Sequence, residues 1–490
     1  MMKPYPKTLG ELKRTGYQAR HVKDELRANL TRKLKAREPL FPAIVGYEET
    51  VVPQIVNAIL SRHDFILLGL RGQAKTRLLR SLTRLLDPVI PVIQGSELNE
   101  DPLRPQSAAA RRLVESAGDD TPIGWLAAED RYHEKLATPD VTIADLIGDI
   151  DPIKAAKEKR ALSDPEVIHY GIVPRTNRGI FAVNELPDLP TRIQVGLLDI
   201  LEERDIQIRG FPIRLPLDLL VVFTANPEDY TNRGSIITPL RDRIASQIQT
   251  HYPLSIDHGM AITSQEAWCG RGAEPAVRVP AHFRHIVEQV AVQARTSSFV
   301  DQKSGVSARM TIALLENLIS SAERRAFLNG LGDTCVRVSD LDSAIPAITG
   351  KIELVYEGEQ QGPTQVARHL IGKAVKMVFD EVMPDPYKDL KAGVTNAEYD
   401  QVLRFFKSGG QARTSDTACD LDLHQDLGKI PGLLELARKH FHPQSPAEEA
   451  SVMELILEGL HQSALLAKRP ELSGASYVDQ FDDMVKDLSR

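Results

Sequence analysis

Cysteine is scarce in this sequence: Cys269, Cys335 and Cys419 are the only three among 490 residues, and they form no CxxC pair. This scarcity argues against a disulfide framework and against a zinc knuckle. No apolar run approaches the ~20 residues that a membrane-spanning helix needs, and the first residues lack the apolar core of a signal peptide. A net charge of −7 argues against a surface coated with basic residues for nucleic acid. We therefore expect a cytoplasmic protein without membrane insertion, and we do not expect nucleic acid as its partner.

The N-terminal segment, residues 1–39, is basic and predicted to be helical. Leu26, Leu30 and Leu34 recur in it every four residues, which predicts a helix with a thin apolar stripe. Such a helix either docks on the main body of the protein or binds an acidic partner or nucleic acid. The sequence alone leaves both readings open.

Residues 40–254 alternate short apolar runs with helical stretches. The runs at 65–68, 180–183 and 219–223 are continuous, which is typical of strands buried on both faces of a parallel sheet. We therefore expect an α/β nucleotide-binding core with helices on both faces of the sheet. Alternating residues at 206–215 predict a small hairpin between two of these elements.

The remainder of the chain is predicted to be mostly helical. Residues 255–355 read as an all-α lid, and residues 356–490 as a C-terminal helical region of unknown role. Within the latter, the polar stretch 408–420 predicts a flexible loop.

The most informative segment is a phosphate-binding loop that follows one predicted strand and opens a predicted helix. That context distinguishes a phosphate loop from a glycine-rich turn with a capping lysine. Converging backbone N–H groups and a helix N-terminus bind phosphate oxygens. Lys75 then carries the charge to the β- and γ-phosphates, and Thr76 offers its hydroxyl to Mg²⁺. The predicted ATP-binding residues are Gly69, Leu70, Arg71, Gly72, Gln73, Ala74, Lys75 and Thr76.

Two polar residues end the strand at 180–183, where an open parallel sheet places its ligands. Glu185 carries a carboxylate that can orient or deprotonate the attacking water. Asn184 is predicted to contact Mg²⁺, although an aspartate is expected there. Asparagine keeps an oxygen acceptor and loses the charge, which should weaken the hold on Mg²⁺ by roughly 1–2 kcal/mol. Read alone, Glu185 is equally well a solvated acid at a strand end.

Two further segments bear polar groups suited to a γ-phosphate. Asn226 follows the strand at 219–223 and can hydrogen-bond the phosphate or the water, although Asn-Pro by itself is a turn signal. Residues 239–243 contain two arginines, which either stabilise transition-state charge or form a surface salt-bridge cluster.

These motifs and their order give residues 41–352 a resemblance to the AAA+ ATPases of the MoxR and magnesium chelatase ATPase-subunit group. The loop GLRGQAKT resembles the MoxR version, in which alanine often precedes the lysine. Residues 177–179 with the acidic pair resemble the group's "NRG…DE" segment, and 197–204 resemble the helix before its hairpin insert. Residues 224–227 are similar to its sensor 1.

The resemblance implies roles for two arginines and an assembly. Arg243 matches the arginine finger, which acts on the neighbouring subunit, and Arg309, in Ser307-Ala308-Arg309, matches sensor 2. It implies self-association into a ring, usually a hexamer, with ATP and Mg²⁺ bound between core and lid. It also implies a partner carrying a von Willebrand factor A domain. After residue 356 the chain does not resemble the metal-binding domain of chelatase partner subunits.

The expected function is an ATP-hydrolysing motor subunit that remodels a client or drives metal insertion with a partner protein. One alternative is a nucleotide-gated scaffold in which Asn184 marks a weakened catalytic site. The other is a DNA-associated AAA+ regulator, which the basic N-terminal segment favours and the absence of a GAFTGA string disfavours.

Overall fold

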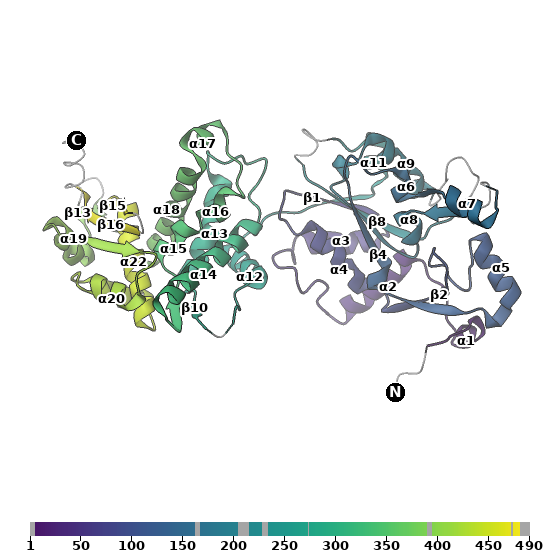
Figure 1. Cartoon of the computed structure of the whole chain (residues 1–490), viewed down its shortest axis with the longest axis horizontal. Coiled ribbons are helices and arrows are strands. Elements are labelled where there is room, and N and C mark those ends of the chain that lie inside the picture. Colours follow the sequence, from purple (N-terminus) through teal and green to yellow (C-terminus); the bar gives the residue numbers. More distant parts are fainter. Residues whose placement is uncertain are drawn as a thin grey trace. The chain divides into compact units, whose positions relative to one another are not determined.

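The computed structural model shows two compact units (Figure 1), residues 1–251 and residues 252–490. The sequence placed the end of the nucleotide-binding core at residue 254, close to this division. Of the predicted hairpin at 206–215, only Leu215 lies among the described residues. The described residues are 5–161, 167–203, 215–227, 234–272, 274–389, 394–471 and 474–480.

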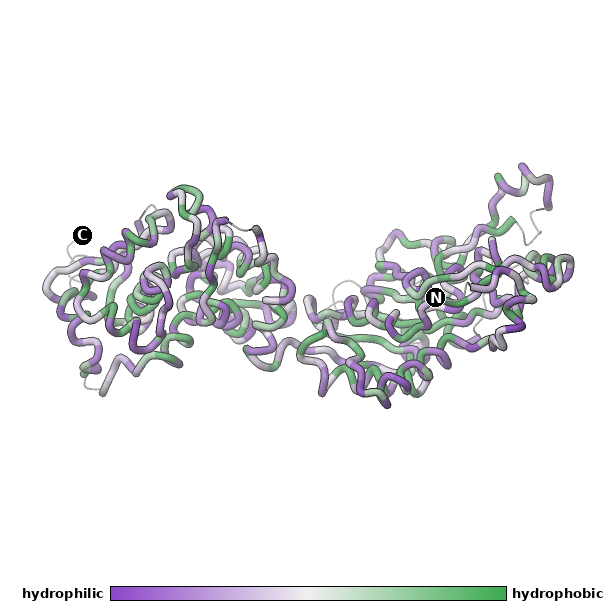
Figure 2. Tube along the Cα trace, turned by 90° about the horizontal axis from the view of Figure 1, so that it is seen from below, coloured by the Kyte–Doolittle hydropathy of each residue, from purple (hydrophilic) through white to green (hydrophobic). Residues whose placement is uncertain are grey.

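The N-terminal unit is built around a five-stranded sheet in which every neighbouring pair is parallel. β1, β7 and β8 lie inside the sheet and are buried along their whole length, as their continuous apolar sequences predicted. Figure 2 shows hydrophobic stretches of the chain, in green, within this unit. In spatial order the strands are β4 (Tyr132–Leu136), β7 (Gly179–Asn184), β8 (Leu219–Ala225), β1 (Phe65–Leu68) and β9 (Ser246–Gln249).

Helices cover both faces of this sheet, because alternate residues of each strand point to opposite faces. Ile180 packs into one core cluster with α2 (Val22–Lys35), α3 (Val51–Leu60) and α4 (Lys75–Ser81). Phe181, the next residue, packs into the other cluster. That cluster holds α6 (Ile143–Leu146), α8 (Ile172–Arg175), α9 (Thr191–Glu202) and α11 (Thr238–Arg243). The predicted α/β core with helices on both faces is confirmed.

The basic N-terminal segment docks on this core. Leu26 and Leu30 of α2 are buried in the cluster that contains Ile180, while Leu34 is 42% exposed at the end of the stripe. Glu25, on the same helix, accepts two hydrogen bonds of 2.7 Å from the guanidinium of Arg131, and both side chains are buried. Of the two interpretations of this helix, docking on the main body of the protein is the one that the structure shows.

Smaller elements complete the N-terminal unit at the rim of the sheet. Two antiparallel pairs, β2 with β3 and β5 with β6, lie outside the central sheet. The bounds of these four strands and of the α-helices not yet given are α1 (Leu9–Arg14), β2 (Val89–Ile93), α5 (Ala108–Ala117), β3 (Ile123–Ala127), β5 (Gly148–Ile150), α7 (Pro152–Glu158) and β6 (Ile168–Tyr170).

The C-terminal unit is largely helical, as predicted. No helix among the described residues of either unit is long and apolar enough to cross a membrane. The helices are α12 (Ile256–Glu266), α13 (Ala281–Thr296), α14 (Arg309–Asn329), α15 (Val338–Ser343), α16 (Ile345–Thr349), α17 (Tyr356–Gln361), α18 (Pro363–Val382), α19 (Asp400–Lys407), α20 (Asp420–Gly428), α21 (Leu433–Phe441) and α22 (Pro446–Gln462).

The C-terminal unit also contains strands that the sequence analysis did not predict. β10 (Ala276–Arg278) and β11 (Asp333–Cys335) form a parallel pair, and β12 (Tyr387–Asp389) pairs with β13 (Val394–Thr395). An antiparallel sheet has the order β14 (Ala412–Ser415), β16 (Gly474–Asp479), β15 (Leu466–Glu471).

The flexible loop predicted at 408–420 is wrong, because this stretch contains β14. Its backbone pairs with β16, a partner distant in the sequence, and Ala412 and Thr414 are buried on one face of the strand. A polar sequence gains strand structure here through tertiary pairing, which local propensity does not report.

Helices from before and after residue 355 share one core. α13 packs against α18, and α18 packs against α22. A buried charge network joins the same two segments, since Asp420 contacts both Arg325 and Arg337. The predicted division at residue 355 therefore lies inside a single compact unit.

Candidate functional site

The predicted phosphate loop curls between β1 and α4. Gly72 and Ala74 both have positive φ, of 75° and 55°. Glycine adopts this left-handed conformation freely, whereas a residue with a side chain is strained in it. Ala74 is exposed and bears the smallest side chain that carries a Cβ, which keeps the steric cost of this conformation low. Leu70 and Arg71 are half-buried in the same loop.

The loop is braced by residues that follow β9 and by the segment before α3. The Thr250 hydroxyl donates to Gln73 Oε1 at 2.6 Å. The Tyr47 hydroxyl lies 3.0 Å from the carbonyl oxygen of Gln73 and 2.7 Å from that of His251. A Cβ at Gly69 would collide with the Thr250 hydroxyl oxygen and with Gln73 Oε1, so any other residue at the start of the loop would force these two side chains to move.

Lys75 and Thr76 begin α4 and carry the chemistry expected of the loop. Lys75 is 7% exposed, and its ammonium donates to the carbonyl oxygens of Gly69 and Leu70, the latter at 3.1 Å. These bonds hold a buried positive charge inside the curl of the loop. The Thr76 hydroxyl donates to Asn184 Oδ1 at 3.4 Å, which joins the loop to the end of β7.

Asn184 and Glu185 lie where β7 ends. Glu185 has a φ of 55°, and a strained backbone in a residue that is not glycine is often found at functional sites. Its N–H donates to the Thr224 hydroxyl at 3.0 Å, and that hydroxyl donates to Asn184 Oδ1 at 3.4 Å. Thr224 of β8 thus fixes both residues, a role that the sequence analysis did not assign to it.

Asn226 follows β8 at the same edge of the sheet. The N–H of Gly69 donates to the carbonyl of Ala225 at 3.2 Å, so the loop and the end of β8 are in contact. The structure therefore brings together three of the predicted groups: the loop, the pair Asn184 and Glu185, and Asn226. All of them follow the carboxyl ends of β1, β7 and β8, where open parallel sheets bind ligands.

The two predicted arginines do not join this cluster within the N-terminal unit. Arg243 ends α11 and donates to Glu202 of α9 at 2.6 Å. It lies shortly before Ser246, which pairs with Phe65 at the amino end of β1, whereas the phosphate loop follows the carboxyl end. Arg309 is exposed and belongs to the C-terminal unit, at the start of α14.

Sequence reasoning missed two charged residues beside Asn184. Arg80 of α4 donates from Nε to Glu134 Oε2 at 3.1 Å, and a second, shorter contact joins the same two side chains. The pKa of the Glu134 carboxyl is lowered, chiefly by this hydrogen bond from Arg80 and also by the Tyr132 hydroxyl and the Asn184 side chain. The sequence analysis did not recognise β4 as a strand, so nothing placed Glu134 at the site.

The donor set fits ATP with Mg²⁺. The described residues contain no group of three or more His, Cys, Asp or Glu that could hold a metal ion by themselves. Mg²⁺ bound with a nucleotide needs few protein ligands, because phosphates and waters supply the others. The Thr76 hydroxyl and the Asn184 amide supply hard oxygen donors, and they lie in contact at 3.4 Å. The site can hold a phosphate chain on the loop and a magnesium ion beside it.

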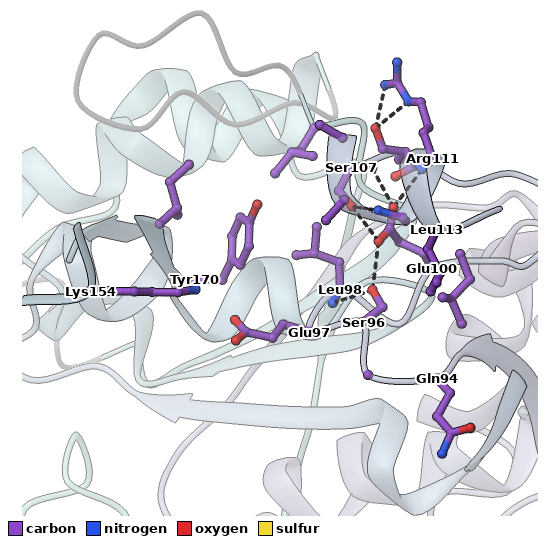
Figure 3. A pocket seen from close by; sticks show the side chains of 18 of the residues that line it. Gln94, Ser96, Glu97, Leu98, Glu100, Ser107, Arg111, Leu113, Lys154 and Tyr170 are labelled. Carbon is purple, nitrogen blue, oxygen red and sulfur yellow. Dashed lines mark hydrogen bonds between the residues drawn. The ribbon is translucent and has the colours of Figure 1, made fainter. Parts of the chain in front are cut away.

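A cavity of about 660 Å³ in the N-terminal unit is lined by other residues (Figure 3). None of the predicted site residues lines it. Figure 3 shows the carboxylate of Glu100 at this cavity, where it accepts from the hydroxyls of Ser96 and Ser107 at 2.8 and 2.9 Å. Its other oxygen accepts two backbone N–H groups. Because the chain's own donors satisfy both oxygens, Glu100 shapes the loop before α5 and offers nothing to a ligand.

Comparison with known proteins adds one related sequence and several related folds. No family model matches the chain. Over 116 residues it is 27% identical to the chaperone MoxR1 of Mycobacterium tuberculosis (strain ATCC 25618 / H37Rv). This match covers 24% of the chain, and the chain spans 28% of the length of that curated relative.

Among solved structures, the complex between subunits BchI and BchD of magnesium chelatase is similar, with 18% identity and a TM-score of 0.34. That match covers 66% of this chain and 98% of the other. NtrX from Brucella abortus in complex with ATP has 13% identity and a TM-score of 0.37, and the match covers 73% of this chain and 67% of NtrX. At these TM-scores the solved structures carry no argument about function.

A parallel sheet with a phosphate loop at its carboxyl edge is the fold of a P-loop nucleotide-binding protein. More narrowly, the resemblance to MoxR-like AAA+ ATPases that the motifs indicated is confirmed by the curated relative.

Proposed function

We propose that this chain is an ATP-binding and ATP-hydrolysing motor subunit of the MoxR and magnesium chelatase type. The observation that carries the proposal is the convergence of three sequence segments at one sheet edge. Lys75 and Thr76 follow β1, Asn184 and Glu185 end β7, and Asn226 follows β8. Hydrogen bonds from Thr76 to Asn184 and from Glu185 to Thr224 connect these segments.

Each residue has a defined task in this proposal. The backbone of the loop and the ammonium of Lys75 hold the phosphates of ATP. Thr76 and Asn184 hold the magnesium ion, which neutralises charge on the phosphates when it is bound. Glu185 orients the attacking water and accepts its proton, and Asn226 positions the same water. Thr224 keeps Asn184 and Glu185 in place through its hydroxyl.

The two arginines extend the proposal to an assembly. Arg243 lies toward the amino end of β1, away from the loop that follows the carboxyl end of the same strand. This placement supports a role at the site of a neighbouring subunit, and an arginine acting between subunits needs a head-to-tail ring, as in a hexamer. Arg309 is the proposed sensor of the γ-phosphate. The motor would remodel a client or drive metal insertion with a partner that carries a von Willebrand factor A domain.

Two substitutions test the nucleotide site. Lys75→Ala should abolish ATP binding measured by calorimetry, because it removes the cation buried within the loop. The matched control is Lys429→Ala, which removes an exposed lysine of the C-terminal unit and should leave binding unchanged. Glu185→Gln should keep ATP binding and stop turnover, since glutamine cannot accept the proton. Wild-type affinity in Lys75→Ala, or wild-type turnover in Glu185→Gln, contradicts the assignment.

Mixing two inactive variants tests Arg243. Arg243→Ala subunits and Lys75→Ala subunits should each be inactive alone, because an arginine finger contributes roughly 10³–10⁵ in rate. Mixed assemblies should regain ATPase activity at interfaces that pair an intact Lys75 with an intact Arg243. Mixtures that assemble, as measured by light scattering, and stay inactive at every ratio contradict a role between subunits.

A nucleotide-gated scaffold is a second candidate that one observation favours. Asn184 is neutral and lies where the related ATPases usually carry an aspartate. Turnover at saturating ATP and Mg²⁺ separates the two candidates. A measurable rate that Glu185→Gln removes supports the motor. Tight ATP binding with no turnover in the wild type supports the scaffold.

A further inference from the structure

Glu134 and Asn184 lie on the same face of the central sheet. β4 and β7 pair in parallel, with Glu134 opposite Ala182 and Leu136 opposite Asn184. Residues two apart on a strand share a face, so Glu134 and Asn184 both point toward the side covered by α4. Thr76 and Arg80 are one helical turn apart on α4. Thr76 contacts Asn184, and Arg80 contacts Glu134.

The hydrogen-bond partners of Asn184 show how its side-chain amide is oriented. Its Oδ1 accepts the hydroxyl of Thr76 and the hydroxyl of Thr224, each at 3.4 Å. The NH₂ end of the amide is left for Glu134, which lies on the same face of the sheet and whose pKa is lowered in part by the Asn184 side chain. An ionised carboxylate only accepts hydrogen bonds, so the NH₂ end of the amide is the end that meets Glu134. The oxygen end consequently faces Thr76 and the phosphate loop.

An asparagine needs this arrangement, whereas an aspartate does not. Both ends of an aspartate side chain are oxygens, so either end can serve a magnesium ion. If the amide group rotated so that its oxygen and nitrogen exchanged places, it would present NH₂ donors to the metal instead of an oxygen. A charged acceptor on the NH₂ end also polarises the amide and increases the negative charge on Oδ1. Glu134 can therefore replace part of what the missing carboxylate at position 184 would supply.

We propose that Glu134 is a positioning residue that fixes the Asn184 amide with its oxygen toward Thr76 and the bound Mg²⁺. This proposal rests on the proposed function, because it assumes that Mg·ATP binds at the phosphate loop. Arg80 is the counter-charge that holds the carboxylate in place through two contacts.

A simple structural salt bridge between Arg80 and Glu134 is the competing explanation. Arg80 is 62% exposed, and pairs of this kind contribute little to stability, typically below about 1 kcal/mol. Such a bridge would not change how strongly nucleotide binding depends on Mg²⁺. The Mg²⁺ dependence of binding therefore separates a positioning role from a structural one, without any measurement of turnover.

The test measures the Mg²⁺ concentration that gives half-maximal ATP binding by calorimetry. Glu134→Gln should raise this concentration about tenfold, because glutamine can donate to Asn184 Oδ1. The Asn184 amide can then rotate so that its oxygen no longer faces the metal. The matched control is Tyr132→Phe, which removes the 3.1 Å hydrogen bond from the tyrosine hydroxyl to Glu134 and leaves Asn184 untouched. That variant should keep the wild-type Mg²⁺ requirement.

A double substitution provides a second test of the role of Glu134. Asn184→Asp alone places two carboxylates side by side, and their repulsion should cancel the benefit of the added charge. Asn184→Asp with Glu134→Gln removes the repulsion and should lower the Mg²⁺ requirement at least tenfold below that of Glu134→Gln alone. A salt bridge that only stabilises the fold predicts instead that Asn184→Asp lowers the Mg²⁺ requirement by the same factor with and without Glu134→Gln.

The possible outcomes separate the two proposals. A wild-type Mg²⁺ requirement in Glu134→Gln, or an effect of Asn184→Asp that is the same with and without Glu134→Gln, overturns the positioning role and leaves the ATPase proposal standing. A wild-type protein that binds no ATP at any Mg²⁺ concentration overturns the ATPase proposal, and the role of Glu134 with it.

Discussion

Replacing Asp420 by asparagine is expected to destabilise the C-terminal unit strongly, because Asp420 lies in a buried charge network. Its Oδ1 is 3.2 Å from Arg325 Nε and 3.0 Å from Arg337 Nη1, and its Oδ2 accepts the Thr334 hydroxyl at 2.6 Å. Both guanidinium groups are essentially inaccessible to solvent. Asp340 supplies the other close carboxylate, 2.7 Å from Arg325.

The size of the effect follows from the charges that remain. In Asp420→Asn, two buried arginines are left with Asp340 as their close carboxylate. Breaking a buried ion pair by removing one partner costs about 3–5 kcal/mol. Burial raises the pKa of the nearby Glu454 carboxyl, and its ionisation can return part of the lost negative charge, so the lower end of this range is expected. For a unit of this size, about 3 kcal/mol corresponds to a fall in Tm of roughly 6–12 °C.

Hydrogen exchange in a urea series measures this effect in each unit separately. Peptides from α14 and from α22 should lose protection together at a lower urea concentration in the variant, because both helices belong to one unit. Peptides from β7 and β8, in the N-terminal unit, should be unchanged. The matched control is Asp416→Asn, which breaks an ion pair with the half-exposed Arg324 and should cost less than about 1 kcal/mol.

Two results would refute this reasoning. A loss below about 1 kcal/mol in Asp420→Asn would mean that the network tolerates an unpaired arginine, contrary to the cost of buried charges. Loss of protection in α22 with α14 unchanged would mean that the segments on either side of residue 355 unfold independently. In that case the shared core of the C-terminal unit would not be cooperative.

Two further predictions concern ionisable groups of the C-terminal unit. Burial raises the pKa of the Cys335 thiol to about 12, so iodoacetamide at pH 8.5 should alkylate the half-buried Cys269 and Cys419 well before Cys335, as peptide mass spectrometry will show. Equal labelling of all three would contradict the burial of Cys335. Burial lowers the pKa of His282 from 6.5 to about 4, so the unfolded state binds the proton first as the pH falls. The C-terminal unit should therefore lose roughly 3 kcal/mol between pH 6.5 and 4 from this histidine, and His282→Phe should remove that part of the pH dependence in urea titrations.

Much of the nucleotide-binding core could be predicted from the sequence, because local signals and global fold agree there. The strands β1, β7 and β8 are continuous apolar runs, which only a doubly covered sheet buries completely. The phosphate loop has its own local signature of small residues followed by Lys75 and Thr76. Parallel strands place their carboxyl ends at one edge, so the meeting of Asn184, Glu185 and Asn226 with the loop also followed from the sequence.

The strands of the C-terminal unit could not be predicted in the same way. β14 reads as a polar loop, and its structure comes from backbone pairing with β16, which lies about sixty residues later in the chain. The buried network around Asp420 is likewise formed by residues far apart in sequence, such as Arg325 and Arg337. No local pattern marks a charged residue as buried when its partner comes from another element.

The sequence by itself determined the nucleotide-binding fold and the residues at its phosphate loop, since strand periodicity and loop composition are local properties. The tertiary structure decided what stands beside those residues. The pairing of β4 with β7 puts Glu134 on the same face of the sheet as Asn184, and α4 brings Arg80 into contact with Glu134. It also decided that Arg243 lies toward the opposite end of β1 from the loop. These placements depend on strand order and packing, which join segments that have no common pattern in the sequence.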